Sequence, residues 1–379
     1  MSEIRVNSIG NESNTGGPVL SGITTFSGQQ YFIPPTGTTA ERPSDCPPGS
    51  IRFNTDSAHL EYWNGLVWLE FEASSEELGQ GTTGDPGTGT RAIIHMGYHP
   101  ANLNTINALN MANGGSATDF GNSTVTARQQ TSCSSSVRAL RAGGYSSSYL
   151  DTIDFVTISS TGDASDFGNL TQARGGYLGG LSNNTRGVFA GGYKDGPATR
   201  YNIIDYVTIA ATGNAVDFGD LSQARTGLGS GVASPVRGVF FGGYTPSQVT
   251  TIDYITISTL GNAQDFGDLT GAKRTGAGAS NTTRGLYMAG QRTPLGSSNV
   301  IDFITIATIG NAQDFGDLNA SSDMGASVAS PIKAIHHEAT NNTSISAVMI
   351  ATTGNSTAFG DTSQNAAQTS GCSNGHGGL

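Results

Sequence analysis

Charge is scarce in this sequence, and it leans to one sign. Charged side chains make up 12% of the 379 residues, and the formal net charge is −11. That charged share is about half of what soluble proteins usually have. The 18 lysines and arginines form no basic run or stripe. A chain without such a stripe is not expected to bind nucleic acid, so we interpret the acidity as a feature that favours solubility.

Cysteines and long apolar runs are scarce as well. The three cysteines, Cys46, Cys133 and Cys372, are too few and too scattered for a disulfide framework or a zinc site. The opening MSEIRVNSIGNESN lacks the apolar stretch of a secretory signal. No run approaches the ~18 apolar residues that a membrane span needs. We therefore expect a soluble protein that is made in a cytoplasm and does not insert into a membrane.

Glycine, in contrast, is abundant, with 54 residues, and it accompanies an internal repeat. Glycine supplies the positive φ angles that tight turns need, which favours an all-β protein. Two independent markers recur about every 48 residues, and internal periods of this length indicate repeat architectures. The first marker is the Phe of a DFG-like stretch: Phe120, Phe167, Phe218, Phe266, Phe315 and Phe359. The second is a cation that opens another segment: Arg91, Arg138, Arg186, Arg237, Arg284 and Lys333.

Each of the six units contains four short segments with the alternation or short apolar runs of β-strands. In the fourth unit they are Arg225–Ser234, Arg237–Tyr244, Thr251–Ile257 and Ala263–Leu269. Gly-Asn pairs mark the turn between the last two segments. Four strands per unit, repeated six times, predict a six-bladed β-propeller over residues 91–379, with the small-residue segment innermost.

The two ends of the repeat predict how the propeller closes. The segment that begins at Arg91 has no small-residue segment before it, whereas Ala367–Gly375 is such a segment with no unit after it. We expect this C-terminal strand to complete the first blade, because an open ring would leave unpaired strand edges. The recurring RAGGY, FAGGY and FFGGY, together with the repeat length, resemble the Kelch pattern. The expected fold is thus an all-β, six-bladed, Kelch-like β-propeller.

The first ninety residues form a separate region. Gly49–Phe71 predicts three short strands, the last two joined by a hairpin at Asn64-Gly65. The preceding PPTGTTAERPSDCPPG is interpreted as a Pro-rich connector, and residues 74–90 as a flexible linker. Because so short a module cannot bury a core by itself, residues 1–73 are predicted to serve attachment or oligomerisation. The predicted assembly residues are its exposed aromatics: Phe53, Tyr62, Trp63, Trp68 and Phe71.

IRFNTDSAHLEYWNG, together with the opening residues and YFIPPTGTTAERP, resembles virion structural and tail-fibre proteins of bacteriophages, particularly those that infect cyanobacteria. The resemblance covers roughly residues 1–72. It implies a virion component whose N-terminal end attaches to other virion proteins and whose C-terminal head is displayed. A homo-oligomer is expected, with a trimer as our interpretation, because fibre-type appendages are commonly trimeric.

Sequence features that could carry chemistry have a structural interpretation that we prefer. The DFG motif recurs in every unit without a phosphate-binding loop, which excludes kinase chemistry. The repeated Asp154, Asp205, Asp253 and Asp302 are expected to hydrogen-bond backbone in a neighbouring turn. His95 and His337 occupy equivalent positions in blades one and six, with His336 and His376 nearby. Packing at this seam is preferred over a metal site, so no metal or cofactor is expected. Cys133 and Cys372 fall in neighbouring blades and could lie close together, although a disulfide is not expected in a reducing cytoplasm.

The loops between the second and third segments differ greatly from blade to blade, whereas the other turns barely change. Irregular loops on a rigid scaffold are where recognition usually occurs. Aromatic faces suit stacking on sugars, although strand-end tyrosines could equally pack between blades. The predicted receptor-binding residues are Tyr98, Tyr145, Tyr149, Tyr193, Tyr201 and Tyr244.

The leading functional hypothesis is a phage tail fibre or appendage subunit that binds a host glycan or protein receptor, and not an enzyme. Sialidase boxes and a Tyr–Cys–His copper arrangement are both absent from the sequence. Two alternatives stay open. One is a capsid or tail decoration or connector protein whose propeller is purely structural. The other is a polysaccharide-degrading enzyme.

Overall fold

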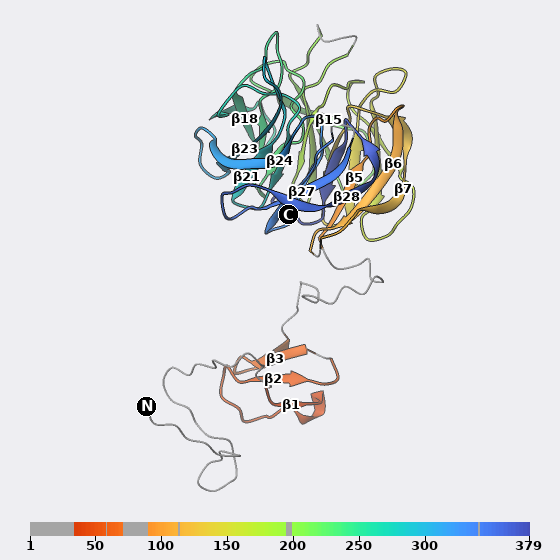
Figure 1. The fold of residues 1–379 in the computed structure, drawn as a ribbon. Coiled ribbons are helices and arrows are strands. Elements are labelled where there is room, and N and C mark those ends of the chain that lie inside the picture. The colour runs from red at the N-terminus through yellow and green to blue at the C-terminus, as the bar shows by residue number, and fades with distance from the viewer. Residues whose placement is uncertain (1–33, 58, 71–89, 113, 195–198, 340–341) are drawn as a thin grey trace. The chain divides into compact units, whose positions relative to one another are not determined.

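The structure is a computed structural model that describes residues 34–57, 59–70, 90–112, 114–194, 199–339 and 342–379. Within these ranges the protein is all-β, because one 3-10 turn, η1 (Thr39–Glu41), is the only helical element. The chain forms two compact units, Met1–Ser74 and Ser75–Leu379 (Figure 1). No helix among the described residues has the length and apolar character needed to cross a membrane.

The first unit contains one small mixed sheet. Its strand order is β1 (Thr36–Gly37), β2 (Ile51–Asn54), β3 (His59–Trp63) and β4 (Trp68–Glu70), with β1 parallel to β2 and the other pairs antiparallel. The predicted Pro-rich connector therefore contains a strand and a 3-10 turn. The carboxylate of Glu41 accepts hydrogen bonds from the amide and hydroxyl of Thr38, which fixes this turn.

The predicted two-residue hairpin at Asn64-Gly65 is wrong. Trp63 pairs directly with Trp68, so four residues form the turn. The side-chain oxygen of Asn64 accepts hydrogen bonds from the amides of Leu66 and Val67, at 2.8 Å each. Asn can thus organise a longer turn by bonding to nearby backbone, in competition with the tight turn that Asn-Gly favours.

The second unit contains, in its described residues, six sheets built around four antiparallel strands each. In spatial order, sheet 1 is β29 (Ser370–Ser373), β5 (Arg91–His95), β6 (Leu103–Asn110) and β7 (Thr118–Ala127). Sheet 2 is β8 (Thr131–Ser134), β9 (Arg138–Ala142), β10 (Thr152–Thr157) and β11 (Ser165–Asn169). Sheet 3 is β12 (Gly179–Ser182), β13 (Arg186–Ala190), β14 (Ile203–Thr208) and β15 (Val216–Asp220).

The last three sheets repeat this arrangement. Sheet 4 is β16 (Val232–Ala233), β17 (Arg237–Phe241), β18 (Thr251–Thr256) and β19 (Gln264–Asp268). Sheet 5 is β20 (Ala277–Ser280), β21 (Arg284–Met288), β23 (Gly296–Thr305) and β24 (Gln313–Ser322), with the short β22 (Gln291–Arg292) also on β23. Sheet 6 is β25 (Ser327–Ala329), β26 (Lys333–His337), β27 (Asn342–Met349) and β28 (Thr357–Ala366).

Sheet 1 combines the two ends of this unit. Strand β29 pairs antiparallel with β5, matching Ser370 to His95 and Ser373 to Ala92. The predicted pairing of residues 367–375 with the strand that begins at Arg91 is therefore present. Figure 1 shows the consequence: the C-terminal strands β27 and β28 lie beside β5, β6 and β7.

Each sheet contacts the next through recurring backbone hydrogen bonds. A glycine in the turn before the fourth strand donates its N–H to the marker Phe carbonyl of the preceding sheet, at 2.8–3.1 Å. The sixth of these bonds runs from sheet 1 back to sheet 6. The pairs are Gly162 to Phe120, Gly213 to Phe167, Gly261 to Phe218, Gly310 to Phe266, Gly354 to Phe315 and Gly115 to Phe359.

The second marker of the repeat has the same role. Each of these cations donates to carbonyl oxygens of the next sheet, and each lies over an aromatic ring of its own sheet. The Nζ of Lys333 in sheet 6 reaches the carbonyl of Ala112 in sheet 1 at 2.9 Å. The apolar core is divided in the same way: its buried clusters each lie between two neighbouring sheets, as with Phe167 and Phe189 between sheets 2 and 3.

Candidate functional site

The variable loops, in their described residues, lie at one end of the second unit. In an antiparallel sheet the loop between the second and third strands lies at the same end as the chain that enters the first strand. Isolated bridges join the two segments here: Arg128 to Tyr145, Gly175 to Tyr193, Thr226 to Tyr244, Arg274 to Gln291 and Tyr98 to Ala367. We call this end, with its tyrosines and arginines, the loop face.

The repeated Gly-Gly before these tyrosines is required by close packing. Gly143 has a φ of +63°, and a Cβ there would lie 2.7 Å from the carbonyl oxygen of Arg174. Gly144 has a φ of +108°, and its Cβ would lie 2.8 Å from the carbonyl oxygen of Arg128. Two glycines therefore let the second strand leave the sheet between two backbones and place the following tyrosine on the loop face.

The predicted tyrosines form a chain of contacts across sheets 1 to 3. The Arg128 guanidinium lies 5.1 Å from the ring centroid of Tyr98 and 5.3 Å from that of Tyr145. The rings of Tyr145 and Tyr149 meet edge to face at 5.1 Å, and those of Tyr149 and Tyr193 at 5.4 Å. These side chains are half-buried, so they both pack against neighbouring segments and present part of their surface to solvent.

A second group lies on sheets 3 to 5. The ring of Tyr244 lies between two guanidinium groups, 4.9 Å from that of Arg200 and 4.8 Å from that of Arg274. Arg274 also donates from Nε to the amide oxygen of Gln291 at 2.8 Å, and Gln291 occupies the position that tyrosine has in sheets 1 to 4. Tyr201, the remaining predicted residue, has no ring contact with either group among the described residues; its amide donates to the carbonyl oxygen of Gly192 at 2.9 Å.

Five arginines or lysines on the loop face were not singled out by the sequence, but their positions follow a rule. Of the 18 cations, three precede residue 91. In the second unit, six bridge neighbouring sheets, as described above, and four form buried ion pairs with aspartates. All the remaining cations lie in the loops of this one end: Arg128, Lys194, Arg200, Arg274 and Arg292.

No model of a protein family matches the chain, and a search of curated proteins finds no similar sequence.

The entry to the first strands carries an unusual backbone. The residue that follows the bridged position has a positive φ in sheets 1 to 5, and so does Met324 at the entry to sheet 6. Four of these residues are not glycine: Gln129 (60°), Thr275 (58°), Met324 (60°) and Gln368 (59°). Tyr177 also has a φ of 58°. Left-handed backbone at non-glycine residues costs about 1–3 kcal/mol each and clusters at functional sites. The sequence does not predict which non-glycine residues adopt this left-handed backbone.

The centre of the loop face is a small hollow lined by Gln130, Tyr177, Thr275 and Met324, among others. Burial raises the pKa of Tyr177, and the nearby carboxylate of Asp323 adds to this effect. Burial also raises the pKa of Asp323, more than Ser297 and Arg274 lower it. Burial thus acts against the charged form of each group, and Arg274 acts in the opposite direction on Asp323.

The channel below this hollow is too narrow for a ligand. It is lined by the first strands of all six sheets and has a volume of about 40 Å³, enough for a few waters. Residues 376–379 lie across it: the ring Nε2 of His376 is 2.9 Å from the carbonyl oxygen of Ser134, and Gly377 donates to the carbonyl oxygen of Ser280 at 2.8 Å. At this end of the second unit, a larger ligand can therefore bind only on the outer surface of the loop face.

The repeated aspartates are structural, and their partners go beyond the prediction. The amide N–H groups of Thr171 and Ser222, in the preceding connections, donate to Asp205 and Asp253, as predicted. Asp154 instead accepts from the amide of Thr124, which lies in strand β7. Each aspartate also pairs with a buried cation: Arg141–Asp154 at 3.0 Å, Arg174–Asp205 at 2.9 Å, Arg225–Asp253 at 2.8 Å and Lys273–Asp302 at 3.0 Å. The recurring QAR or GAK after the fourth segment was the available signal for three of these cations.

The seam histidines are buried among hydroxyl groups. Nδ1 of His95 lies 3.2 Å from Ser123 Oγ, and Nδ1 of His337 lies 3.2 Å from Thr369 Oγ1. Burial lowers the pKa of each to about 4, which keeps them neutral. No group of three His, Cys, Asp or Glu side chains in the described parts of the chain is arranged to hold a metal. Cys133 and Cys372 both line the channel and are free thiols.

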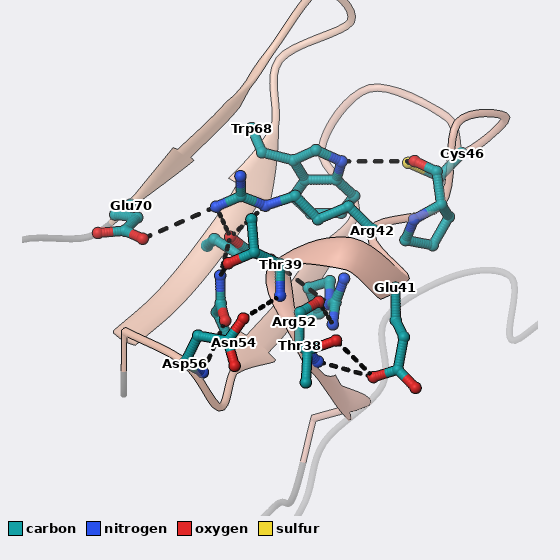
Figure 2. Close-up of polar contacts among 12 residues, drawn as sticks. Thr38, Thr39, Glu41, Arg42, Cys46, Arg52, Asn54, Asp56, Trp68 and Glu70 are labelled. Carbon is teal, nitrogen blue, oxygen red and sulfur yellow. Dashed lines mark hydrogen bonds and ion pairs between the residues drawn. The ribbon is translucent and has the colours of Figure 1, made fainter.

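The small sheet of the first unit has its polar side covered. Glu61, which is fully buried, pairs with Arg42 at 2.6 Å and with Arg52 at 3.4 Å, and accepts from Asn54. Figure 2 shows this network under the 3-10 turn, with Trp68 donating to the carbonyl of Pro43. By strand alternation the predicted Trp63 and Trp68 lie on this covered side, with ring centroids 5.7 Å apart.

The opposite side of this sheet is apolar and open. Alternation places Ile51, Phe53, Leu60, Tyr62 and Leu69 together there, in the cross-strand register of β2, β3 and β4. Ile51 is 51% exposed, Leu60 41% and Leu69 38%. Of the predicted assembly residues, Phe53 and Tyr62 are therefore on the open side, whereas Phe71 is outside the described residues.

Proposed function

We propose that residues 91–379 form a six-bladed, Kelch-like β-propeller. The support is the order of contacts: each first strand neighbours the next, from β8 through β12, β16, β20 and β25 to β29, and β29 neighbours β8. The Lys333–Ala112 and Gly115–Phe359 hydrogen bonds between sheets 6 and 1 repeat those between the other sheets. Such a platform holds its loops rigidly at one end.

We propose further that the protein is a binding protein and not an enzyme: a phage tail fibre or appendage subunit that recognises the host surface. The observation that carries the binding role is the loop face, where tyrosine rings and guanidinium groups from five sheets form two adjoining groups. Stacked aromatic and cationic surfaces suit sugars and other polar ligands. The phage assignment rests on the resemblance of residues 1–72.

Binding to arrayed bacterial surface polysaccharides and to intact host cells tests the role. Replacing Tyr145 and Tyr244 together by Leu should weaken binding at least tenfold, about 1.4 kcal/mol, without unfolding the protein. Tyr206→Leu with Tyr254→Leu is the matched control, because these rings contact Arg186 and Arg237 on the opposite part of their sheets. Equal losses in both variants, or no loss in the first, would refute a binding role for the loop face.

The open apolar side of the first unit favours a second role, attachment to other virion proteins or to copies of the same chain. Apolar patches of this kind mark interaction sites. Leu60→Ser with Leu69→Ser should lower the mass in solution if copies associate through this side. Leu66→Ser, at an 84% exposed position in the turn, should not. An unchanged mass in all variants would leave attachment to a different virion protein as the only form of this role.

A further inference from the structure

We propose that the loop face binds an acidic polysaccharide, with carboxylate groups of the sugar chain held by Arg128 and Arg200. This inference rests on the proposed binding role and names its ligand class. Its basis is the hydrogen bonding of the cations in the second unit.

Arg128 and Arg200 lack the acceptors that the structural cations have. The ten structural cations donate to a carbonyl oxygen or pair with an aspartate, as described above. In the described parts of the chain, the guanidinium groups of Arg128 and Arg200 have no hydrogen-bond or ion-pair acceptor, and the Nε of each is buried without a partner. A buried guanidinium N–H without an acceptor costs free energy unless an anion or a water accepts a hydrogen bond from it. A carboxylate fits the planar set of donors of a guanidinium.

Aromatic rings fix these arginines in place. Arg128 lies between Tyr98 and Tyr145, and Arg200 lies against Tyr244. A guanidinium stacked on a ring loses little further freedom when an anion binds at its edge, because its plane is already set. The same rings offer apolar faces to the sugar itself.

Charge favours an anionic ligand at the loop face, and the extent of the two groups favours a polymer over a small molecule. The protein has a net charge of −11, yet the five cations with no role between or within sheets are all on the loop face. Together the two groups extend over sheets 1 to 5, and an extended polymer can contact more of such a surface than a single monosaccharide can. Nucleic acid is disfavoured because the cations of the chain form no basic run or stripe that could follow a phosphate backbone.

The full-length protein should bind alginate, a polyuronate, more tightly than dextran, a neutral polysaccharide, in calorimetric titrations at 50 mM salt. The affinity for alginate should fall as salt increases. Arg128→Gln with Arg200→Gln should weaken alginate binding at least tenfold, and the corresponding Lys variants should restore part of the loss. Arg292→Gln is the matched control and should change affinity less than threefold: its Nε is likewise buried without a partner, but its Nη2 donates to Thr270 at 3.5 Å.

Three outcomes overturn the inference, and they separate it from the proposed function. If alginate and dextran bind equally and only the tyrosine variants lose affinity, the binding role stands and the acidic ligand is wrong. If single-stranded DNA competes with alginate as well as alginate itself does, the arginines attract any polyanion and the inference fails. If neither polysaccharide nor host cells bind, both the inference and the proposed function fail.

Discussion

Three of the four buried ion pairs join the connection before a sheet to that sheet, whereas Arg141–Asp154 lies within sheet 2. Arg174 and Thr171 belong to the connection between sheets 2 and 3, and both hold Asp205 of β14, where neither charged side chain has measurable exposure. Removing one member of a buried pair leaves the other charge uncompensated, which typically costs 3–5 kcal/mol. The pairs therefore matter most for keeping adjacent sheets in register.

Arg174→Met should lower the free energy of unfolding by about 3 kcal/mol or more. Adding Asp205→Asn should restore much of the loss, because the amide removes the unpaired charge and can still accept from Thr171. Urea unfolding followed by tyrosine fluorescence measures both. Equal stability of the single variant and the unchanged protein would show that water compensates Asp205.

The buried histidines should lower the free energy of unfolding in mild acid. Burial depresses the pKa of His95 from 6.5 to about 4, so between these values the unfolded chain binds a proton that the folded chain does not. The stability is therefore full above about pH 6.5 and falls as the pH drops toward 4, by on the order of 3 kcal/mol for this residue. His95→Gln should flatten this part of a stability-against-pH profile, measured by urea unfolding. A profile of unchanged slope would contradict the neutral, buried state.

At the scale of the element, the contact between one strand and the next sheet depends on a glycine. Gly168 in β11 has a φ of +146°, and a Cβ there would lie 2.4 Å from the carbonyl oxygen of Gly213 in sheet 3. Gly168→Ala should cost about 2–4 kcal/mol, because both the backbone angle and the contact oppose it. Gly213→Ala is the matched control, since a Cβ at that position meets nothing within 4 Å. Thermal unfolding of the two variants should separate them clearly.

The strands were predictable because their signal is local and repeated. The fourth unit illustrates this, since the predicted Thr251–Ile257 and Ala263–Leu269 correspond to β18 and β19. Its predicted inner strand, Arg225–Ser234, is reduced to the two residues of β16, because successive glycines there adopt positive φ. A segment of small residues indicates which edge of a sheet is crowded, but it does not indicate how many of its residues pair with the next strand.

The site was only partly predictable, because its determinants lie between units. The tyrosines were found from loop variation, but the arginines beside them come from other connections whose proximity no spacing reveals. Arg128 and Arg174 illustrate the difficulty: both follow the fourth strand of a unit, yet one lies on the loop face and the other is buried on an aspartate. A structural cation differs from a cation that is available to a ligand only in the hydrogen-bond or ion-pair acceptors that surround it in the fold.

At the scale of the whole molecule, stability depends on one strand that joins the two ends of the second unit. Strand β29 pairs with β5, and its side chains also reach both neighbouring sheets: Ser370 Oγ is 2.7 Å from Ser132 Oγ in sheet 2, and Ser373 donates to the carbonyl of Ala329 in sheet 6. Without β29, the edge of β5 and the apolar clusters on both sides of sheet 1 would be exposed to water.

Removing residues 367–379 should therefore unfold the second unit as a whole, rather than fray sheet 1 alone. Removing only residues 376–379 is the control and should lower the melting temperature by a few degrees, because it opens the channel but leaves β29 in place. Inserting residues 367–375 between Thr90 and Arg91, through Gly-Ser linkers, should restore a cooperative transition to the shortened chain. This last variant tests most directly whether the second unit depends on closure, because the inserted strand can take the position of β29 while it is joined to the N-terminal end of β5. A shortened chain that melts cooperatively near the temperature of the control would mean that the six sheets are held together by their neighbours in sequence and do not depend on closure.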